Sequence, residues 1–411
     1  MIHIRWRLVA IVGAVVLLVH LLLLSPYLKS HPLHEPHGDA DAAAQGKPAP
    51  ARNEILDLKH PPPVTVTVTK DRAPTATVTA FVTESVPANS PNDTGIVSEK
   101  ANAAFVILTR NQDLKSLRET LAQLEDRFNR RYHYPYVFLN NDPFSDEFKE
   151  KISSVVSGEC QFGLIPHEHW SYPEYINQTK AAEVREDMKR RKIIYGDNEG
   201  YRHMCRYESG FFFRHKLMEQ YKWYWRVEPG VKFGCEIDYD PFMFMEKSGK
   251  KYGFTISIKE YALTIPTLWN TTMEFMEKNK DMIPASNLME FVTGKDGGYN
   301  LCHFWSNFEI ASLDFLRSKE YLAYFDHLDR AGGFFYERWG DAPVHSLGVA
   351  MLLNKSQVHW FEDIGYYHGP LWNCPKGEVN AKKCWCPEEE SIEVKNKRWS
   401  CTVNFVALPN P

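Results

Sequence analysis

A carboxylate that could bind a metal ion follows a strand-forming segment in the middle of the chain. Residues 223–227 (WYWRV) are mostly aromatic or branched, which predicts a β-strand. Glu228 comes next, and Pro229 ends the strand because proline has no backbone N–H for the hydrogen-bond ladder. At the end of a strand in a nucleotide-binding fold, Glu228 is suited to bind a metal ion or to lie beside a phosphate group. A solvated acid in a turn is the commoner explanation for a single residue of this kind. The residues around Glu228 must therefore decide between a turn residue and a metal or phosphate site.

Cysteines form a second group with possible chemistry. All eight lie after residue 100, and four of them lie near the end of the chain: Cys374, Cys384, Cys386 and Cys401. Four cysteines can bind zinc, but zinc sites use pairs of the form Cys-x-x-Cys, whereas the spacing here is Cys-x9-Cys-x-Cys-x14-Cys. We therefore expect disulfides that staple a tail without a core of its own, in an oxidising compartment. The sequence leaves their pairing open.

Alternating apolar runs and helical stripes predict the elements that position these residues. The run 103–108 (AAFVIL) predicts a buried strand, and apolar residues then recur at spacings of three and four from Leu114 to Phe128, which predicts a helix. Further strands are predicted at 136–139 and 160–165, with an amphipathic stretch from Asp146 between them. Strands that alternate with helices form parallel sheets with right-handed crossovers, so we expect an α/β fold.

The carboxyl end of the first strand is a candidate nucleotide-binding edge. Ligands of parallel sheets bind beyond the carboxyl ends of the strands, where Thr109, Arg110 and Asn111 are expected to lie. No GxGxxG motif follows this strand and no Walker A motif occurs in the chain, which argues against a dinucleotide oxidoreductase and a P-loop kinase. The net charge of −4 argues against a nucleic-acid-binding protein, so no nucleic acid is expected among the partners.

The first hundred residues differ from the rest of the chain. Of 24 Phe, 20 Tyr and 11 Trp, only Trp6, Tyr27 and Phe81 lie there. Residues 8–24 are almost entirely apolar and would span roughly 26 Å as a helix, and no small-x-small cleavage site follows them. This favours a transmembrane signal-anchor over a cleaved signal peptide. We predict a cytosolic tail at 1–7, the anchor at 8–24, a disordered stalk rich in Pro and Thr at 25–100, and one globular domain at 101–411.

Several segments spread over positions 103–372 carry a resemblance to a known family. They are AAFVILTRN (103–111), YPYVFLNN (134–141), YRHMCR (201–206), YWRVEP (224–229), KYGFTISI (251–258), YNLCHFWSNFEI (299–310), FYERWGDAPVHS (335–346) and DIGYYH (363–368). In this order and spacing they resemble the fungal type II α-1,2-mannosyltransferases, glycosyltransferase family 15. The anchor and stalk match the layout of that family as well.

The resemblance implies a GT-A-type fold in a single lumenal catalytic domain with a Cys-rich C-terminal tail. It implies a retaining hexosyltransferase that transfers mannose from GDP-mannose, with a divalent metal (usually Mn²⁺), to the 2-hydroxyl of an acceptor mannose. It further implies a single-pass type II protein of the Golgi membrane that acts in protein glycosylation. The acceptors would be mannosylated glycoproteins or other mannosides of the cell wall, and whether they are N-linked, O-linked or lipid-linked stays open.

The resemblance also implies metal ligands. The histidine of the GYYH segment, His368, would bind the metal, since Mn²⁺ accepts imidazole beside oxygen ligands. Glu228 lies at the acidic position of a Glu-Pro-x motif that resembles the Asp-x-Asp metal site of other GT-A enzymes. Many members have Asp after the proline, whereas this chain has Gly230. That difference motivates the alternative of a non-catalytic mannan-binding or scaffold paralogue of the same fold.

The remaining implied roles concern the sugars and the nucleotide. Glu309 matches the candidate nucleophile, which would form a glycosyl-enzyme; in the alternative, same-face substitution, it stabilises positive charge or holds a sugar hydroxyl. Asp341 would bind acceptor hydroxyls or take the proton. Tyr201 or Tyr207 could hydrogen-bond the donor phosphate or the acceptor sugar, with core packing as the alternative. Arg110 could reach the ribose or the diphosphate, with a surface arginine as the alternative.

Overall fold

The computed structural model describes residues 99–409. The predicted cytosolic tail, the anchor at 8–24 and nearly all of the predicted stalk lie outside the described residues. Within residues 99–409, no helix is both long enough and apolar enough to cross a membrane.

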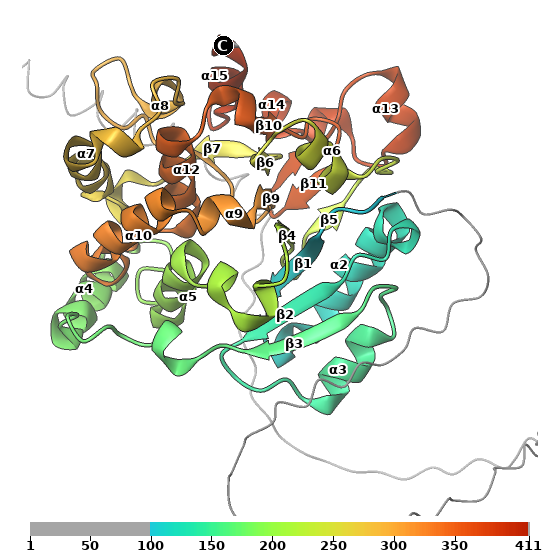
Figure 1. Cartoon of the computed structure of the whole chain (residues 1–411), viewed down its shortest axis with the longest axis horizontal. Coiled ribbons are helices and arrows are strands. Elements are labelled where there is room, and N and C mark those ends of the chain that lie inside the picture. The colour runs from blue at the N-terminus through green and yellow to red at the C-terminus, as the bar shows by residue number, and fades with distance from the viewer. Residues whose placement is uncertain (1–98, 410–411) are drawn as a thin grey trace, which may run out of the picture. The chain divides into compact units, whose positions relative to one another are not determined.

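A mixed seven-stranded sheet forms the centre of the described domain (Figure 1). Its strands lie in the order β10 (Val358–Trp360), β6 (Tyr252–Phe254), β9 (Glu309–Ser312), β4 (Trp223–Arg226), β1 (Ala103–Leu108), β2 (Tyr136–Asn140) and β3 (Cys160–Leu164). Strand β9 runs antiparallel to its neighbours β6 and β4, whereas the other paired strands are parallel. The sheet confirms the predicted α/β class and the parallel pairing of its first strands.

The segments predicted from apolar periodicity form the expected elements. β1 has the predicted bounds, and the helices α2 (Leu114–Arg127) and α3 (Asp146–Ser153) occupy the two intervals between the first three strands. Ser145 caps α3, because its Oγ accepts a hydrogen bond from the backbone N–H of Phe148. β4 ends at Arg226, close to the predicted end of its segment.

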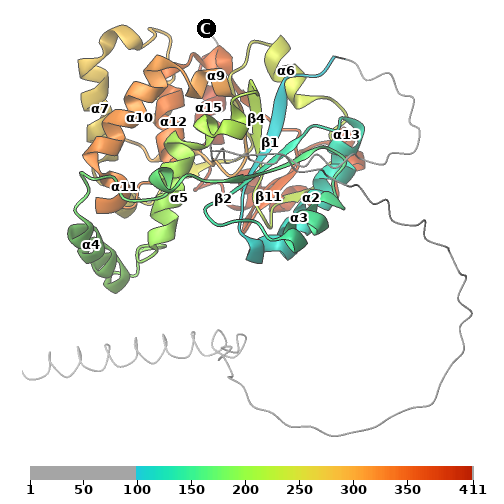
Figure 2. The same cartoon turned by 60° about the horizontal axis from the view of Figure 1, so that its bottom comes forward.

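Helices cover both faces of this sheet (Figures 1 and 2). Phe105 and Ile107 of β1 lie in a core with α2, α3 and α6 (Pro241–Lys247), whereas Ala104 and Val106 lie in a core with α5 (Glu199–Gly210), α10 (Lys319–Ala331) and α12 (Asp341–Leu352). Successive residues of a strand point to opposite faces, so a strand buried on both faces is apolar throughout. The run AAFVIL is apolar throughout because β1 is buried on both faces of the sheet.

Two smaller sheets carry segments that follow the central strands. One has the order β12 (Leu371–Asn373), β11 (Tyr366–His368) and β5 (Lys232–Phe233), and the other pairs β7 (Ser257–Lys259) with β8 (Cys302–Phe304). Because β5 follows β4 closely in the chain and pairs with β11, the chain just after β4 lies near the end of β11. The other helices are α4 (Gln178–Arg190), α7 (Leu268–Lys278), α8 (Met289–Val292), α9 (Leu313–Leu316), α11 (Gly333–Tyr336), α13 (Glu378–Lys383), α14 (Ile392–Lys395) and α15 (Thr402–Ala407).

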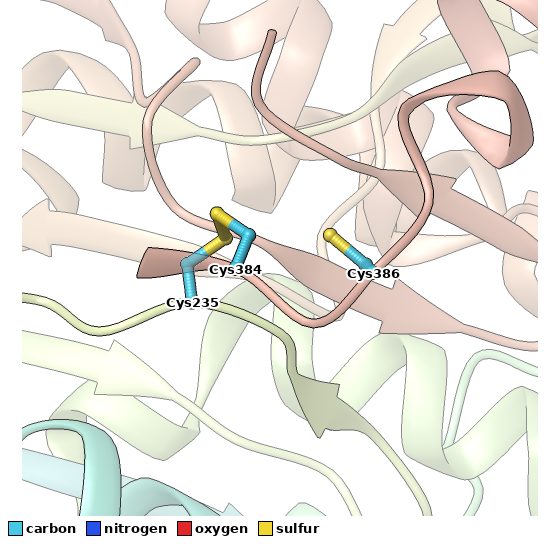
Figure 3. Close-up of side chains that lie close together, drawn as sticks. All are labelled: Cys235, Cys384 and Cys386. Atoms are coloured by element: carbon cyan, nitrogen blue, oxygen red, sulfur yellow. A yellow bond between two sulfur atoms is a disulfide. The ribbon is translucent and has the colours of Figure 1, made fainter. Parts of the chain in front are cut away.

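Three disulfides hold the C-terminal tail, which confirms disulfides over a zinc site. Cys235–Cys384 and Cys302–Cys401 tie the tail to the body of the domain, and Cys374–Cys386 closes a loop within the tail. Figure 3 shows Cys386 beside the Cys235–Cys384 bond, and the three sulfur atoms lie within 4.8 Å of one another. Such a group has the composition of a metal site, but each of its sulfurs is already part of a disulfide.

Candidate active site

Two strands of opposite direction bring candidate residues to one edge of the central sheet. β4 ends at Arg226, β9 begins at Glu309, and these two residues are paired in register. The carboxyl end of a strand and the amino end of its antiparallel neighbour lie at the same edge. Glu228, which follows β4, is therefore brought to the edge at which Glu309 lies.

Glu309 lies among hydrogen-bond donors and has no exposed surface. Tyr224 Oη donates to Glu309 Oε2 over 2.8 Å, and Tyr252 Oη donates to Oε1 over 2.7 Å. His345 Nδ1 lies 2.8 Å from the same Oε1, and His345 Nε2 lies 3.0 Å from the carbonyl oxygen of Glu208. Both ring nitrogens face acceptors, so the imidazolium form, which has two N–H donors, fits this position. Burial lowers the pKa of His345, but the Glu309 and Asp341 carboxylates together raise it by more, so the net direction is upward.

The guanidinium of Arg226 is surrounded by carboxylates. Nη1 donates to Asp341 Oδ2 over 2.6 Å, and Nη2 donates to Glu228 Oε1 over 2.5 Å. Glu208 Oε2 lies 3.8 Å from Nη1. Asp341 is the first residue of α12, and Ser306 Oγ also donates to its Oδ2, over 2.6 Å. Burial lowers the pKa of Arg226, but these carboxylates raise it by more, so the guanidinium stays charged.

The balance between burial and the neighbouring charges gives the three carboxyl groups different acidities. Burial raises the pKa of Glu228, but Arg226 and His368 lower it by more, to about 2. Burial also raises the pKa of Asp341, but Arg226, His345 and the Ser306 hydroxyl together outweigh it, so that this pKa lies below its usual value. For Glu208 the effect of burial prevails over Arg226, and the pKa rises to about 7. At neutral pH, Glu228 and Asp341 are anions and weak bases, whereas Glu208 is close to half-protonated.

His368, the last residue of β11, faces Glu228. His368 Nε2 lies 3.3 Å from Glu228 Oε2, and the imidazole packs edge-on against Trp305 with 4.6 Å between ring centroids. His368 Nδ1 is buried and has no hydrogen-bond partner among the described residues. The nitrogen that faces the Glu228 carboxylate is Nε2, and an imidazole nitrogen next to a carboxylate oxygen is a donor set that Mn²⁺ accepts. The two predicted metal ligands thus lie together, and their chemistry fits the metal.

Glu228 and His368 leave most of a metal ion's coordination positions to other ligands. Within residues 99–409, the only group of three or more His, Cys, Asp or Glu side chains with closely spaced ligand atoms is the disulfide-bonded cysteine group. Mn²⁺ prefers an octahedral shell rich in oxygen. The oxygens of a diphosphate can complete such a shell, so this pair suits an ion that is shared with a nucleotide.

Tyr201 and Tyr207 both lie on α5 but face different surroundings. Tyr201 is seven residues before Glu208, which places the two on the same face of the helix, and the Arg338 guanidinium lies 5.2 Å from the centroid of its ring. Tyr207 packs against Trp170 in the core, and its buried hydroxyl has no hydrogen-bond partner among the described residues. Neither tyrosine is hydrogen-bonded to the carboxylates around Arg226. Their catalytic roles stay predictions.

Arg110 and Gly230 lie outside these hydrogen bonds as well. Arg110 follows β1 as expected, but its Nε pairs with Asp113 Oδ2 over 3.1 Å, and most of the side chain is exposed. Its contact with a nucleotide stays a prediction. Gly230 has φ = 90°, a backbone conformation that glycine adopts without strain, and its N–H donates to Thr120 Oγ1 over 3.0 Å. The turn after Glu228 therefore has a conformational reason to contain glycine instead of a second acid.

Several residues of the site were not among the predicted ones, among them Arg226, His345, Tyr224 and Tyr252. Arg226 stands two positions before Glu228 in a matched segment, and His345 stands four positions after Asp341 on one helix face, so both had a local signal in the sequence. Tyr224 shares the segment of Arg226, but nothing in that segment shows which residue it contacts. Tyr252, on β6, reaches Glu309 only because β6 pairs with β9, and no local signal in the sequence marks it.

Comparison with known proteins identifies a family and close relatives. The family model described as glycolipid 2-alpha-mannosyltransferase matches residues 66–410. The chain is 54% identical to glycolipid 2-alpha-mannosyltransferase 1 of Candida albicans over 328 residues, which cover 79% of this chain and 76% of that protein. It is 55% identical to the alpha-1,2 mannosyltransferase KTR1 of Saccharomyces cerevisiae over 318 residues, which cover 76% of this chain and 80% of that protein.

Two crystal structures are similar to the described domain. Core-mannan synthase A of Aspergillus fumigatus, in a form with Mn and GDP, superposes with a TM-score of 0.69 at 40% sequence identity, covering 76% of this chain and 86% of that one. The mannosyltransferase Ktr4p of Saccharomyces cerevisiae in complex with GDP superposes with a TM-score of 0.72 at 38% identity, covering 75% of this chain and 82% of that one.

Proposed function

Because the chain belongs to the glycolipid 2-alpha-mannosyltransferase family, glycosyltransferase family 15, we propose that the site around Arg226 catalyses its mannosyl transfer. The chain is an α-1,2-mannosyltransferase that uses GDP-mannose and Mn²⁺ and retains the anomeric configuration. One observation carries the assignment of the site. Glu228, Glu309, Asp341 and His368, from segments far apart in the sequence, meet at one sheet edge.

Glu228 and His368 would hold the Mn²⁺ ion, which neutralises charge on the GDP leaving group when it is bound. Glu228 is ionised at physiological pH, because its pKa is about 2. Arg226 binds Glu228 Oε1 and so turns Oε2 toward His368. The guanidinium thus orients the metal-binding carboxylate and adds a fixed positive charge near the diphosphate.

Glu309 places a fixed negative charge next to the reacting sugar. The mannosyl group develops positive charge as its bond to the diphosphate breaks, and a nearby carboxylate stabilises that charge. Both oxygens of Glu309 already accept hydrogen bonds, from Tyr224 and from Tyr252 and His345, and neither is exposed. Attack on the sugar would require at least one of these bonds to break. We therefore favour the charge-stabilising role, in same-face substitution, over the covalent glycosyl-enzyme.

Asp341 is suited to bind the acceptor more than to act as its base. Oδ2 accepts hydrogen bonds from Arg226 and Ser306, whereas Oδ1 makes no hydrogen bond with a described residue and can accept one from a sugar hydroxyl. The lowered pKa of Asp341 makes it a weak base. In same-face substitution, the proton of the acceptor 2-hydroxyl passes to the departing phosphate oxygen as the new glycosidic bond forms.

We further propose that the enzyme is a single-pass type II protein of the Golgi membrane with a GT-A-like lumenal domain. The apolar segment 8–24, followed by a Pro-rich stretch, supports an anchor and a stalk. The three disulfides support an oxidising lumen. Its acceptors would be mannosylated glycoproteins or other mannosides that contribute to the cell wall.

The activity is tested with the purified full-length chain, GDP-mannose, Mn²⁺ and methyl α-mannoside. We expect a disaccharide that NMR identifies as α-1,2-linked and that an α-1,2-specific mannosidase cleaves. A β-linked product would contradict retention, and another linkage would contradict the assigned acceptor hydroxyl. Binding of GDP without any transfer, by a folded chain, would favour the non-catalytic paralogue instead.

A further inference from the structure

Glu208 carries a buried carboxyl group that the proposed mechanism does not use. It lies on α5, and only 4% of its side chain is exposed. Neither carboxyl oxygen makes a hydrogen bond with a described residue, and the nearest cationic atom, Arg226 Nη1, is 3.8 Å away. A buried carboxylate without a hydrogen bond is costly, so such groups are normally paired. The missing partner of Glu208 is therefore expected to arrive from outside the chain.

The two ends of the Arg226 guanidinium show what kind of partner fits. Nη2 faces Glu228, on the side where His368 lies, whereas Nη1 faces Asp341 and Glu208. The diphosphate belongs on the Nη2 side, with the metal ligands, and a second anion beside Glu208 would be repelled. A sugar hydroxyl has no charge and donates a hydrogen bond that a carboxyl oxygen accepts. The Nη1 side is thus suited to a sugar.

The backbone of Glu208 is fixed at this position. Its carbonyl oxygen faces His345 Nε2 at 3.0 Å, and His345 Nδ1 in turn faces Glu309. This chain of contacts connects α5 to α12 and to the central sheet, so Glu208 cannot move away from Arg226 without disturbing the surroundings of Glu309. A hydroxyl that binds Glu208 is therefore held at a defined place relative to the reacting centre.

We infer that Glu208 is a sugar-binding residue of the transfer reaction, whose carboxyl group hydrogen-bonds a hydroxyl of the donor or acceptor mannose at the Nη1 side of Arg226. This inference rests on the proposed function of the site. Burial raises the pKa of Glu208 to about 7, so the ionised form that accepts and the protonated form that also donates are both present near neutral pH. Either form can pair with a hydroxyl.

The test compares the full-length wild type with Glu208→Leu and Glu208→Gln. Kinetics are measured with GDP-mannose, Mn²⁺ and methyl α-mannoside, and then with analogues of each sugar that lack one hydroxyl at a time. Glu125→Gln is the matched control, because Glu125 is a buried glutamate on α2 that Tyr136 and Asn129 already hydrogen-bond. Donor and acceptor analogues separate the two possible sugars.

For the wild type, we expect one deoxy analogue to lower kcat/KM about 10- to 100-fold, which is the loss of one hydrogen bond to a charged group. With the complete sugar, kcat/KM of Glu208→Leu should already be lower than that of the wild type by this factor. The deoxy analogue should lower the kcat/KM of this variant little further. Glu208→Gln should discriminate less than the wild type between the complete sugar and the deoxy analogue. Glu125→Gln should discriminate between them as the wild type does.

Equal discrimination by the wild type and both Glu208 variants, for every analogue, would overturn the inference. If the leucine variant does not fold, the glutamine variant with the same analogues decides the question, because it keeps the shape of the side chain. A wild type that transfers no mannose would contradict the proposed function instead, and the two failures are thereby distinguished.

Discussion

The two halves of the proposed active site differ in how they hold their carboxylates. The floor consists of Glu309 and the three side chains that donate to it, and the rim consists of Glu228 and His368. Glu309 is 0% exposed and both of its carboxyl oxygens accept hydrogen bonds, whereas the rim side chains are 27% and 30% exposed. The difference indicates that the floor keeps a charge in place, while the rim receives groups from solution.

The halves also depend on different parts of the fold. The floor is built from β4, β6, β9 and α12, which belong to the central sheet and its helical layer. The rim joins the turn after β4 to the end of β11, and β11 pairs with β5 in the small sheet. The Cys235–Cys384 disulfide lies just after β5. Changes in the core should thus affect the floor, and changes in the tail should affect the rim.

Glu309→Gln should have the largest effect on activity. The change removes the floor's negative charge but leaves the rim intact, so we expect kcat to fall about 1000-fold while the Mn²⁺ concentration for half-maximal activity stays the same. Steady-state kinetics over a Mn²⁺ titration measure both quantities. Tyr252→Phe, which removes one donor, is the milder control. A kcat within tenfold of the wild type would show that the floor's charge is not needed.

His368→Ala should have the next largest effect, through the metal. We expect activity at a fixed, limiting Mn²⁺ concentration to fall about 100-fold, and excess Mn²⁺ to restore part of it, because Glu228 remains. His359→Ala is the matched control, since His359 is a half-buried histidine on β10, outside both halves. An unchanged Mn²⁺ dependence of His368→Ala would contradict the assignment of the rim.

Loss of the Cys235–Cys384 disulfide should destabilise the domain and weaken the rim selectively. We expect the double variant Cys235→Ser with Cys384→Ser to lose about 2 to 4 kcal/mol of unfolding free energy and to need more Mn²⁺, with kcat at saturating Mn²⁺ nearly kept. Denaturant unfolding and Mn²⁺ titration measure these effects. Removal of Cys374–Cys386, which spans 12 residues instead of 149, should destabilise less. A larger loss of stability on removal of Cys374–Cys386 than on removal of Cys235–Cys384 would contradict the prediction that the longer-range disulfide stabilises the domain more.

Glu208→Gln should have the smallest effect, on stability as a function of pH. The pKa of Glu208 in the folded state, about 7, exceeds its ordinary value of 4.5, so the folded chain keeps a proton that the unfolded chain releases in this window. Its contribution to stability therefore falls as the pH rises from 4.5 to 7, with Arg226, Asp341, Glu228 and His345 as the charged groups nearby. Glutamine cannot ionise.

The melting temperature of Glu208→Gln relative to the wild type should consequently rise between pH 5 and pH 8, by about 2 °C or more. Thermal unfolding at a series of pH values measures this difference. A difference in melting temperature that does not vary with pH would show that Glu208 is not a buried carboxyl group with a raised pKa. Glu208 and the rim residue Glu228 would then not differ in acidity as the structure indicates.

Periodicity and segment order predicted the parallel half of the sheet well. β1, α2, β2, α3, β3 and β4 follow from apolar runs and helical stripes, because each is specified by its own side chains. β9 and β11 are short strands whose partners lie far away in the chain, and such pairings leave little local pattern. Their positions decide where Glu309 and His368 lie, so the site could not be assembled from periodicity alone.

By itself, the sequence determined which chemical groups are available: Glu228 after a strand, cysteines for disulfides, and the segments that contain Glu309, Asp341 and His368. Only the tertiary structure decided that one buried arginine holds Asp341 and Glu228 as anions while Glu208 stays close to half-protonated. The physical reason is that a carboxyl group's pKa depends on burial and on neighbouring charges, and both are set by contacts between residues distant in the chain.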